Sequence, residues 1–289
     1  MQTGISNKMF DLMQVGYCFH PEAIVSKGKP WKPAIFPSIV GLLKHPQKGY
    51  MLFDTGYAAR FNNLTLKFPE KLYRLVTPMT LPEHESLIQQ LKNKGISTED
   101  IKYIFISHFH ADHIAGLLDF PAAKFIASKK AVDNFLNHSG IHAVIKGYIK
   151  ALLPTDFIDR LSFIESFSSV ALDRFNPFNI GYDILGDGSY FAIELPGHAA
   201  GHFGLLFSDG SISRFLVGDA CWTDDAFKKG VRPNRISGLI MDNWSQYLAT
   251  LNRLNVLYDS NKDVSIIPSH CSNTFDLFHQ DSCHRNCKT

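Results

Sequence analysis

The heptapeptide Ser107-His108-Phe109-His110-Ala111-Asp112-His113 follows directly on the apolar run Tyr103-Ile104-Phe105-Ile106. The run is short, branched and aromatic, which predicts a buried strand. Its potential metal ligands, each offering an imidazole nitrogen or a carboxylate oxygen, are His108, His110, Asp112 and His113. Such ligands must converge on one point, and zinc takes them at about 2.0–2.2 Å. We therefore expect a turning loop that directs the first two side chains to one ion and the last two to a second.

Similar apolar runs elsewhere in the chain also end at candidate ligands. Residues 50–53 precede Asp54-Thr55-Gly56, residues 191–195 precede His198, residues 214–217 precede Asp219, and residues 264–267 precede His270. Helical spacing appears between them, over residues 81–94 with Gly95 as a stop, and over residues 244–258. Alternating strands and helices predict an α/β protein, in which strand ends meet at one edge and build a site there.

The combined pattern resembles the metallo-β-lactamase superfamily. The family's second histidine motif is matched by Gly197-His198-Ala199-Ala200-Gly201-His202, its later aspartate by Gly218-Asp219, and its last histidine by Pro268-Ser269-His270. Asp54, in Phe53-Asp54-Thr55-Gly56, matches the early aspartate, so the resemblance spans roughly residues 35–272. These motifs together are specific for the superfamily and much less so for any one activity.

The resemblance implies a four-layer αββα sandwich and a dinuclear metal site. By this resemblance His108, His110 and His198 hold one ion, Asp112, His113 and His270 hold the other, and Asp219 bridges both. Asp54 and His202 support these ligands by hydrogen bonding, and Asp112 and Asp219 are the catalytic groups that accept and pass the proton. We expect two divalent ions, zinc ahead of iron or manganese, because the ligand set alone does not separate them.

The implied chemistry is hydrolysis of an ester-like bond by a metal-bridging hydroxide. A lactone such as an N-acyl homoserine lactone is the first candidate substrate. A thioester of the glyoxalase II type and a phosphotriester or phosphodiester are the alternatives. Two alternatives come from other functional classes: an iron-dependent member of the superfamily that handles oxygen, and a non-catalytic binding protein. The lactonases have a tyrosine three residues after the bridging aspartate, where this chain has Trp222.

Apolar segments around the motifs predict a substrate with an apolar acyl portion. We expect Trp222, Phe68 and Phe135 to contact it, and residues 128–178 to form a helical, aromatic cap insert. Simple packing of the insert onto the sandwich explains the same aromatic residues equally well. Cys221 is interpreted as an inert buried thiol rather than a group that supports Asp219.

Length and composition allow one domain over residues 1–289, with a flexible tail over residues 279–289. The formal net charge of +2 gives no case for nucleic acid or a membrane as partner, and a homodimer is left open.

The first residues carry no apolar run of signal-peptide length, and the five cysteines form no disulfide-like framework, so we expect a cytoplasmic location. The tail residues His279, Cys283, His284 and Cys287 could form a small zinc site, but their spacing matches no common zinc motif.

Overall fold

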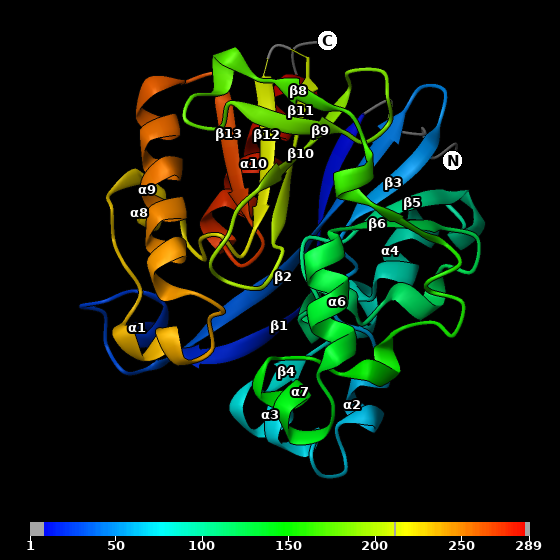
Figure 1. The fold of residues 1–289 in the computed structure, drawn as a ribbon, viewed down its shortest axis with the longest axis vertical. Helices are drawn as coiled ribbons and strands as arrows, with labels where there is room; N and C mark the ends of the chain where they lie inside the picture. The colour runs from blue at the N-terminus through cyan, green and yellow to red at the C-terminus, as the bar shows by residue number, and fades with distance from the viewer. Residues whose placement is uncertain (1–8, 211, 287–289) are drawn as a thin grey trace. The chain divides into compact units, whose positions relative to one another are not determined.

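The computed structural model describes residues 9–210 and 212–286, and it omits the side chains of residues 281–286. The described residues divide into two compact units, residues 9–18 with 40–166 and residues 19–39 with the described part of 167–286. Each unit contains a mixed sheet with helices, which agrees with the predicted α/β class (Figure 1). Within the described residues, none of the helices has the length and apolar character needed to cross a membrane.

The seven-stranded sheet belongs mainly to the first unit and has the order β4-β1-β2-β3-β5-β6-β7. Its strands are β1 (Phe10–Pro21), β2 (Pro33–His45), β3 (Gly49–Phe53), β4 (Met79–Thr80), β5 (Ile101–Phe105), β6 (Lys124–Ala127) and β7 (Leu161–Phe163). Strands β3, β5, β6 and β7 are parallel. Parallel neighbours end at the same edge, so the turn after β3 and the histidine loop after β5 leave the sheet together.

The helices of the first unit are short. They are α2 (Arg60–Leu64), α3 (Lys71–Val76), α4 (Leu87–Asn93), α5 (Ala111–Ile114), α6 (Lys129–Asn137) and α7 (Gly140–Ile145). The predicted helix over residues 81–94 begins only at Leu87, where the Ser86 side chain accepts the N–H of Gln89 and caps the first turn. It ends before Gly95, whose φ of +71° suits glycine at a helix C-terminus.

The predicted helical insert over residues 128–178 is helical only in its first part. After α6 and α7 the chain forms β7, which pairs with β6 at the edge of the first sheet. It then forms β8 (Ser169–Ala171), the edge strand of the second sheet. The second half of this stretch is therefore part of the sheets rather than of a helical cap.

The six-stranded sheet of the second unit has the order β13-β12-β11-β10-β9-β8. Its further strands are β9 (Ile180–Asp183), β10 (Tyr190–Glu194), β11 (Phe203–Asp209), β12 (Ile212–Gly218) and β13 (Val264–Pro268). Strands β10 and β12 are both antiparallel to β11, and β12 is parallel to β13. Strands β10, β12 and β13 therefore run in one direction, and the loops that follow them, which carry His198, Asp219 and His270, leave the sheet at one edge.

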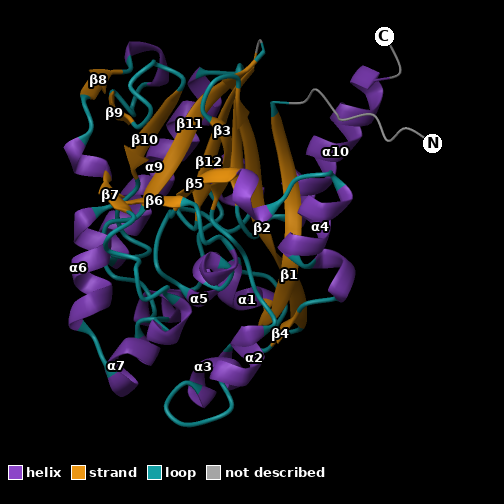
Figure 2. Cartoon of the chain, turned by 90° about the vertical axis from the view of Figure 1, so that its right-hand side faces the viewer, coloured by secondary structure: helices purple, strands orange, loops and turns teal. Residues whose placement is uncertain are grey.

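The helices of the second unit are α1 (Glu22–Val25), α8 (Asp224–Lys228), α9 (Trp244–Ser260) and α10 (Ser272–Asn286), of which α9 was predicted. Figure 2 labels α1, α9 and α10. Tyr247, Leu251 and Leu254 recur at helical spacing on α9 and join the buried cluster that includes Phe215 and Val217 of β12. Helix α10 continues to Asn286, into the stretch that the sequence predicts to be flexible. The side chains of Cys283, His284 and Cys287 lie outside the described residues.

Candidate metal centre

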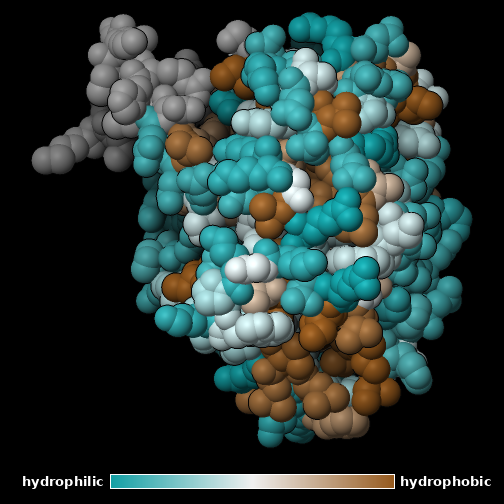
Figure 3. Space-filling model, turned by 90° about the vertical axis from the view of Figure 1, so that its left-hand side faces the viewer, coloured by the Kyte–Doolittle hydropathy of each residue, from teal (hydrophilic) through white to brown (hydrophobic). Residues whose placement is uncertain are grey.

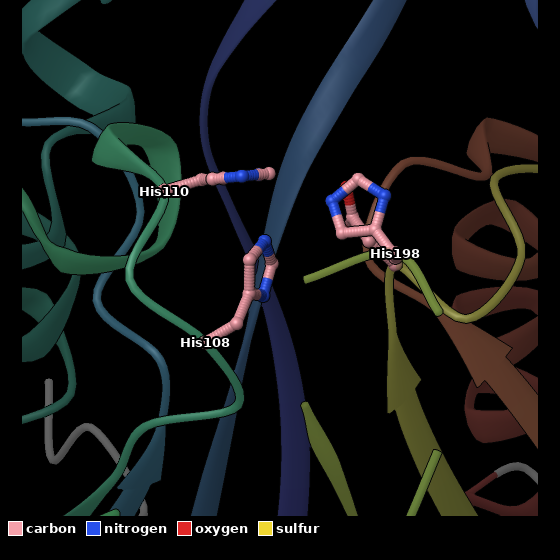
Figure 4. A group of neighbouring side chains, drawn as sticks. His108, His110 and His198 are labelled. Carbon is pink, nitrogen blue, oxygen red and sulfur yellow. The ribbon is translucent and has the colours of Figure 1, made fainter. Parts of the chain in front are cut away.

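The loop after β5 gathers its imidazoles as the sequence predicts. His108 and His113 are fully buried, and Asp112 is 7% exposed on the short helix α5. The ring centroid of His108 lies 4.5 Å from that of His110 and 4.1 Å from that of His113. Figure 4 shows His108 and His110 projecting from this loop. Three imidazoles therefore converge within the first unit alone.

Asp54 holds this loop through three hydrogen bonds. Its Oδ1 accepts the Ser107 backbone N–H at 2.8 Å, and its Oδ2 accepts the Ser107 hydroxyl at 2.7 Å. The same Oδ2 lies 2.7 Å from Nδ1 of His113. A carboxylate on Nδ1 fixes the proton there and leaves the Nε2 lone pair for a metal. Asp54 has a φ of +60°, a strained conformation for a residue with a side chain, which is typical of functional turns.

The rest of the turn after β3 clamps the far end of the histidine loop. The backbone N–H and the hydroxyl of Thr55 both donate to the His113 carbonyl, at 2.8 and 2.9 Å. Gly116 N–H donates to the Thr55 hydroxyl at 3.1 Å, and a Cβ on Gly116 would come within 2.9 Å of the Thr55 Cβ. Glycine is therefore required where the loop passes this close to the turn.

Asp219 is the centre of the second unit's contribution. Its Oδ2 lies 3.2 Å from Nε2 of His198, and its Oδ1 lies 3.1 Å from Nε2 of His270. All three side chains are buried. Nδ1 of His270 donates to the Pro37 carbonyl at 2.6 Å, which places the proton on Nδ1 and leaves the Nε2 lone pair on the Asp219 side. Each carboxylate oxygen thus faces a different imidazole.

His202 uses both ring nitrogens for hydrogen bonds. Its Nδ1 donates to the Leu195 carbonyl at 3.2 Å, and its Nε2 accepts the backbone N–H of Asp219 at 3.2 Å. The fully buried ring therefore connects the end of β10 to the loop after β12. These contacts hold the Asp219 backbone in place and leave His202 no nitrogen for a metal.

Trp222 is hydrogen-bonded to Asp219, whereas the sequence predicts a substrate contact. Its indole N–H donates to Oδ2 of Asp219 at 2.9 Å, and only 8% of the residue is exposed. Indole has a single donor and no acceptor, so this bond uses its whole hydrogen-bonding capacity. The neighbouring Cys221 thiol is fully buried, and burial raises its pKa, which agrees with an inert thiol.

Two contacts to the histidine loop were not predicted. The Tyr73 hydroxyl of α3 donates to Oδ1 of Asp112 at 3.4 Å. Gly147, with a φ of +77°, lies so close to His110 that a Cβ would be 2.7 Å from the imidazole Cδ2. Both residues are more than thirty positions from their partners, and no local pattern links them. Only the fold brings them together.

The remaining predicted substrate residues have different environments. Phe135 is 1% exposed and packs against Phe109 and Tyr148, with ring centroids 5.0 and 5.1 Å away. It therefore belongs to the core and offers no open ring surface, because α6 turns it inward. Phe68 is 70% exposed in the loop before α3.

The donor set fits divalent metal ions. In the described part of the chain, the candidate ligands are His108, His110, Asp112 and His113 in the first unit and His198, Asp219 and His270 in the second. Imidazole and carboxylate suit zinc and other divalent ions. Buried carboxylates such as those of Asp112 and Asp219 are costly unless a cation or hydrogen bonds compensate their charge.

The family model described as the metallo-beta-lactamase superfamily matches residues 36–254. The chain belongs to the metallo-β-lactamase superfamily. The match covers most of the predicted span of residues 35–272 and ends before the Pro268-Ser269-His270 motif. N-acyl homoserine lactonase AttM of Azorhizobium caulinodans is 29% identical over 203 residues, which are 69% of this chain and 70% of that protein. AttM of Agrobacterium fabrum is 26% identical over 66% of this chain and 65% of its own length.

Solved structures confirm the metallo-β-lactamase fold. A variant of AiiA from B. thuringiensis, with N-decanoyl-L-homoserine bound at its active site, superposes with a TM-score of 0.69 at 21% identity. The match covers 92% of this chain and 94% of that one. AidC, a dizinc quorum-quenching lactonase, has a TM-score of 0.63 at 18% identity over 91% of this chain and 87% of its own. The expected fold class is therefore correct.

Proposed function

We propose that this metallo-hydrolase opens the ring of an acyl lactone, with N-acyl homoserine lactones as the first candidates. The observation that carries the proposal is Asp219, whose two carboxylate oxygens face His198 and His270 separately. This is the arrangement that a ligand shared between two ions needs. Relatives named N-acyl homoserine lactonases, and neighbours with acyl-homoserine products bound, support the lactone as substrate.

The proposed ligand assignment is the one that the resemblance to the superfamily implies. His108, His110 and His198 would hold one ion, Asp112, His113 and His270 the second, and Asp219 would contact both. Zinc is the first candidate metal, because the donor atoms suit it and one structural neighbour is dizinc. Two such ions, when bound, supply Lewis acidity that lowers the pKa of water and polarises a carbonyl.

The chain's own residues orient the reactants and move the proton. Water adds to the lactone carbonyl carbon, the ring C–O bond breaks, and the departing alkoxide takes up the water's proton to give an open hydroxy acid. Asp112 is suited to carry that proton, since the residue is still 7% exposed and the Tyr73 hydroxyl donates to one of its carboxylate oxygens. Trp222 and His202 hold Asp219 in place meanwhile.

The test is a substrate panel with the full chain, reconstituted separately with zinc, iron and manganese. The panel contains N-acyl homoserine lactones of several chain lengths, thioesters, phosphotriesters and phosphodiesters. We expect lactones to be turned over fastest, with the product heavier than the substrate by one water in mass spectrometry. His110→Ala should abolish turnover, whereas His84→Ala, whose side chain is 80% exposed, should not. Rapid phosphotriester or phosphodiester turnover with inert lactones and thioesters would overturn the substrate assignment.

A further inference from the structure

A large apolar surface lies at one end of the first unit, over α3 and α7. The two helices contact each other, and brown side chains gather at the lower end of the molecule in Figure 3, where Figure 2 places both helices. Large apolar side chains at this surface are 40–70% exposed. They define the α3–α7 face and are Leu66, Phe68, Leu75, Val76, Ile141 and Ile145.

Six large apolar side chains exposed over two contacting helices are typical of a surface that contacts a partner or a membrane. Phe68, Leu75 and Val76 are each about two-thirds exposed, at 70, 66 and 68%. They lie on α3 and the loop before it. No residue of α3 is buried, so these side chains do not belong to the hydrophobic core. The face therefore needs an apolar or amphipathic occupant.

The charge of the two segments that carry the α3–α7 face indicates what kind of surface binds to it. Residues 66–76 contain Lys67, Lys71 and Arg74 against one acid, Glu70, and residues 136–150 contain Lys146 and Lys150 with no acidic residue. These two segments carry a net charge of +4 in a chain whose total is +2, so the remainder of the chain is net negative. The basic side chains of these two segments, all exposed except the half-buried Lys146, are called here the basic rim of the α3–α7 face.

A symmetric pair of this chain would place the same basic rim against itself, because a twofold contact brings identical patches together. Like charges would then repel where the apolar side chains meet. An anionic lipid surface has the opposite property, since apolar side chains enter the acyl boundary while lysine and arginine attract the headgroups. We propose that the α3–α7 face docks on the surface of an anionic lipid membrane.

The same helices adjoin the metal-ligand loop. Tyr73 of α3 donates to Asp112, and Gly147, two residues beyond α7, lies against His110. Docking through this face would therefore bring the histidine loop of the first unit close to the membrane surface. The docking itself does not depend on which substrate the metal centre cleaves.

The experiment is flotation of the full chain with vesicles of phosphatidylcholine alone or mixed with phosphatidylglycerol, at low and high salt. We expect binding to the anionic vesicles that weakens at high salt. Lys67→Gln with Lys71→Gln should weaken it by about fivefold per charge removed. Leu75→Ser with Val76→Ser should abolish it, because the apolar anchor is lost.

Matched variants separate the face from general surface effects. Lys92→Gln with Lys130→Gln removes two exposed lysines elsewhere in the first unit, and Leu239→Ser removes a side chain that is 83% exposed. Both should bind vesicles like the unmodified protein. Failure of the unmodified protein to float with anionic vesicles would overturn the proposal. So would a stable dimer in sedimentation analysis that Leu75→Ser with Val76→Ser dissociates, since a second copy would then cover the face.

Discussion

Asp219 is held from several sides by groups that fix both its side chain and its backbone. Its carboxylate accepts the Trp222 indole N–H, and its backbone N–H donates to His202. Such contacts matter because a metal ligand must be oriented before the ion arrives, and losing an orienting partner typically costs 10–100-fold in metal affinity or activity. Trp222 and His202, which contact Asp219, are therefore expected to affect metal binding as well as the candidate ligands themselves.

Trp222→Phe tests that orienting role. The variant keeps the aromatic packing and removes the N–H that donates to Asp219, so we expect metal affinity to fall by about 10–100-fold. Competition with a chelator measures this directly. Trp244→Phe is the matched control, since that ring stacks on Tyr247 at 6.0 Å and should leave the affinity unchanged. If Trp222→Phe raised KM for lactones without weakening metal binding, the residue would contact substrate instead.

Gly147→Ala tests the close approach to His110. A methyl group there would lie 2.7 Å from the imidazole Cδ2, so His110 must shift, and we expect a loss of at least about tenfold in metal affinity. Gly140→Ala is the control, because Gly140 also has a positive φ of +54° but has no atom within 4 Å of an added Cβ. Both variants should lose about 1–2 kcal/mol of stability from backbone strain. Equal metal affinity in the two variants would show that the contact is unimportant.

At the scale of elements, Asp224 connects α8 to the start of α10. Its carboxylate accepts hydrogen bonds from Lys228 at 2.7 Å and from Asn273 at 2.6 Å. Burial alone raises the pKa of this carboxyl, but the bonds from Lys228 and Asn273 outweigh burial and the pKa is lowered. The element junction is therefore stabilised by the charged form of Asp224.

Asp224→Asn should destabilise the protein by about 1–2 kcal/mol at neutral pH, because charge-assisted hydrogen bonds are lost. A lowered folded pKa means that this stabilisation is complete above the unfolded pKa of about 4 and disappears as the pH falls through the folded value. Denaturant unfolding across that range should show the two proteins converging in acid. Asp225→Asn, whose partner Lys229 is 68% exposed, should have a much smaller effect. A pH-independent difference would contradict the charge argument.

At the scale of the whole molecule, the proposed metal centre links metal binding to folding. The candidate ligands come from loops after β5, β10, β12 and β13, which are far apart in the sequence. An ion that binds the folded chain and not the unfolded one stabilises it by about 2.7 kcal/mol at a hundredfold excess over the dissociation constant. Stability of the entire chain should therefore depend on metal.

Removal of metal by a chelator should lower Tm, and added zinc should restore it. Asp219→Ala should abolish the rise in Tm with zinc, since it removes the group proposed to contact both ions. Asp259→Ala, an exposed position on α9, should keep the full response. Elemental analysis should find close to two ions per chain in the unmodified protein when purification avoids chelators. Intact, folded and metal-free protein from such a preparation would count against the metal centre.

Local sequence determined the strands, the main helix and the superfamily. The apolar runs before Asp54, His108, His198, Asp219 and His270 form strands because branched and aromatic side chains suit a buried sheet. The spacing of the ligands within the heptapeptide and the following motifs was enough to identify the family, which the family model confirms over residues 36–254. These features depend on residues that are close together in the sequence.

Tertiary structure alone decided the contacts that cross long stretches of chain. Phe135 and Trp222 both read as aromatic residues near the site, but packing buried the first in the core and gave the second a bond to Asp219. Tyr73 reached Asp112, and Gly147 reached His110, through the paths of α3 and α7. Likewise, a near-neutral composition gave no sign of the basic rim around the α3–α7 face. Periodicity reports which side of an element is buried, whereas only packing fixes which side chains from distant segments meet there.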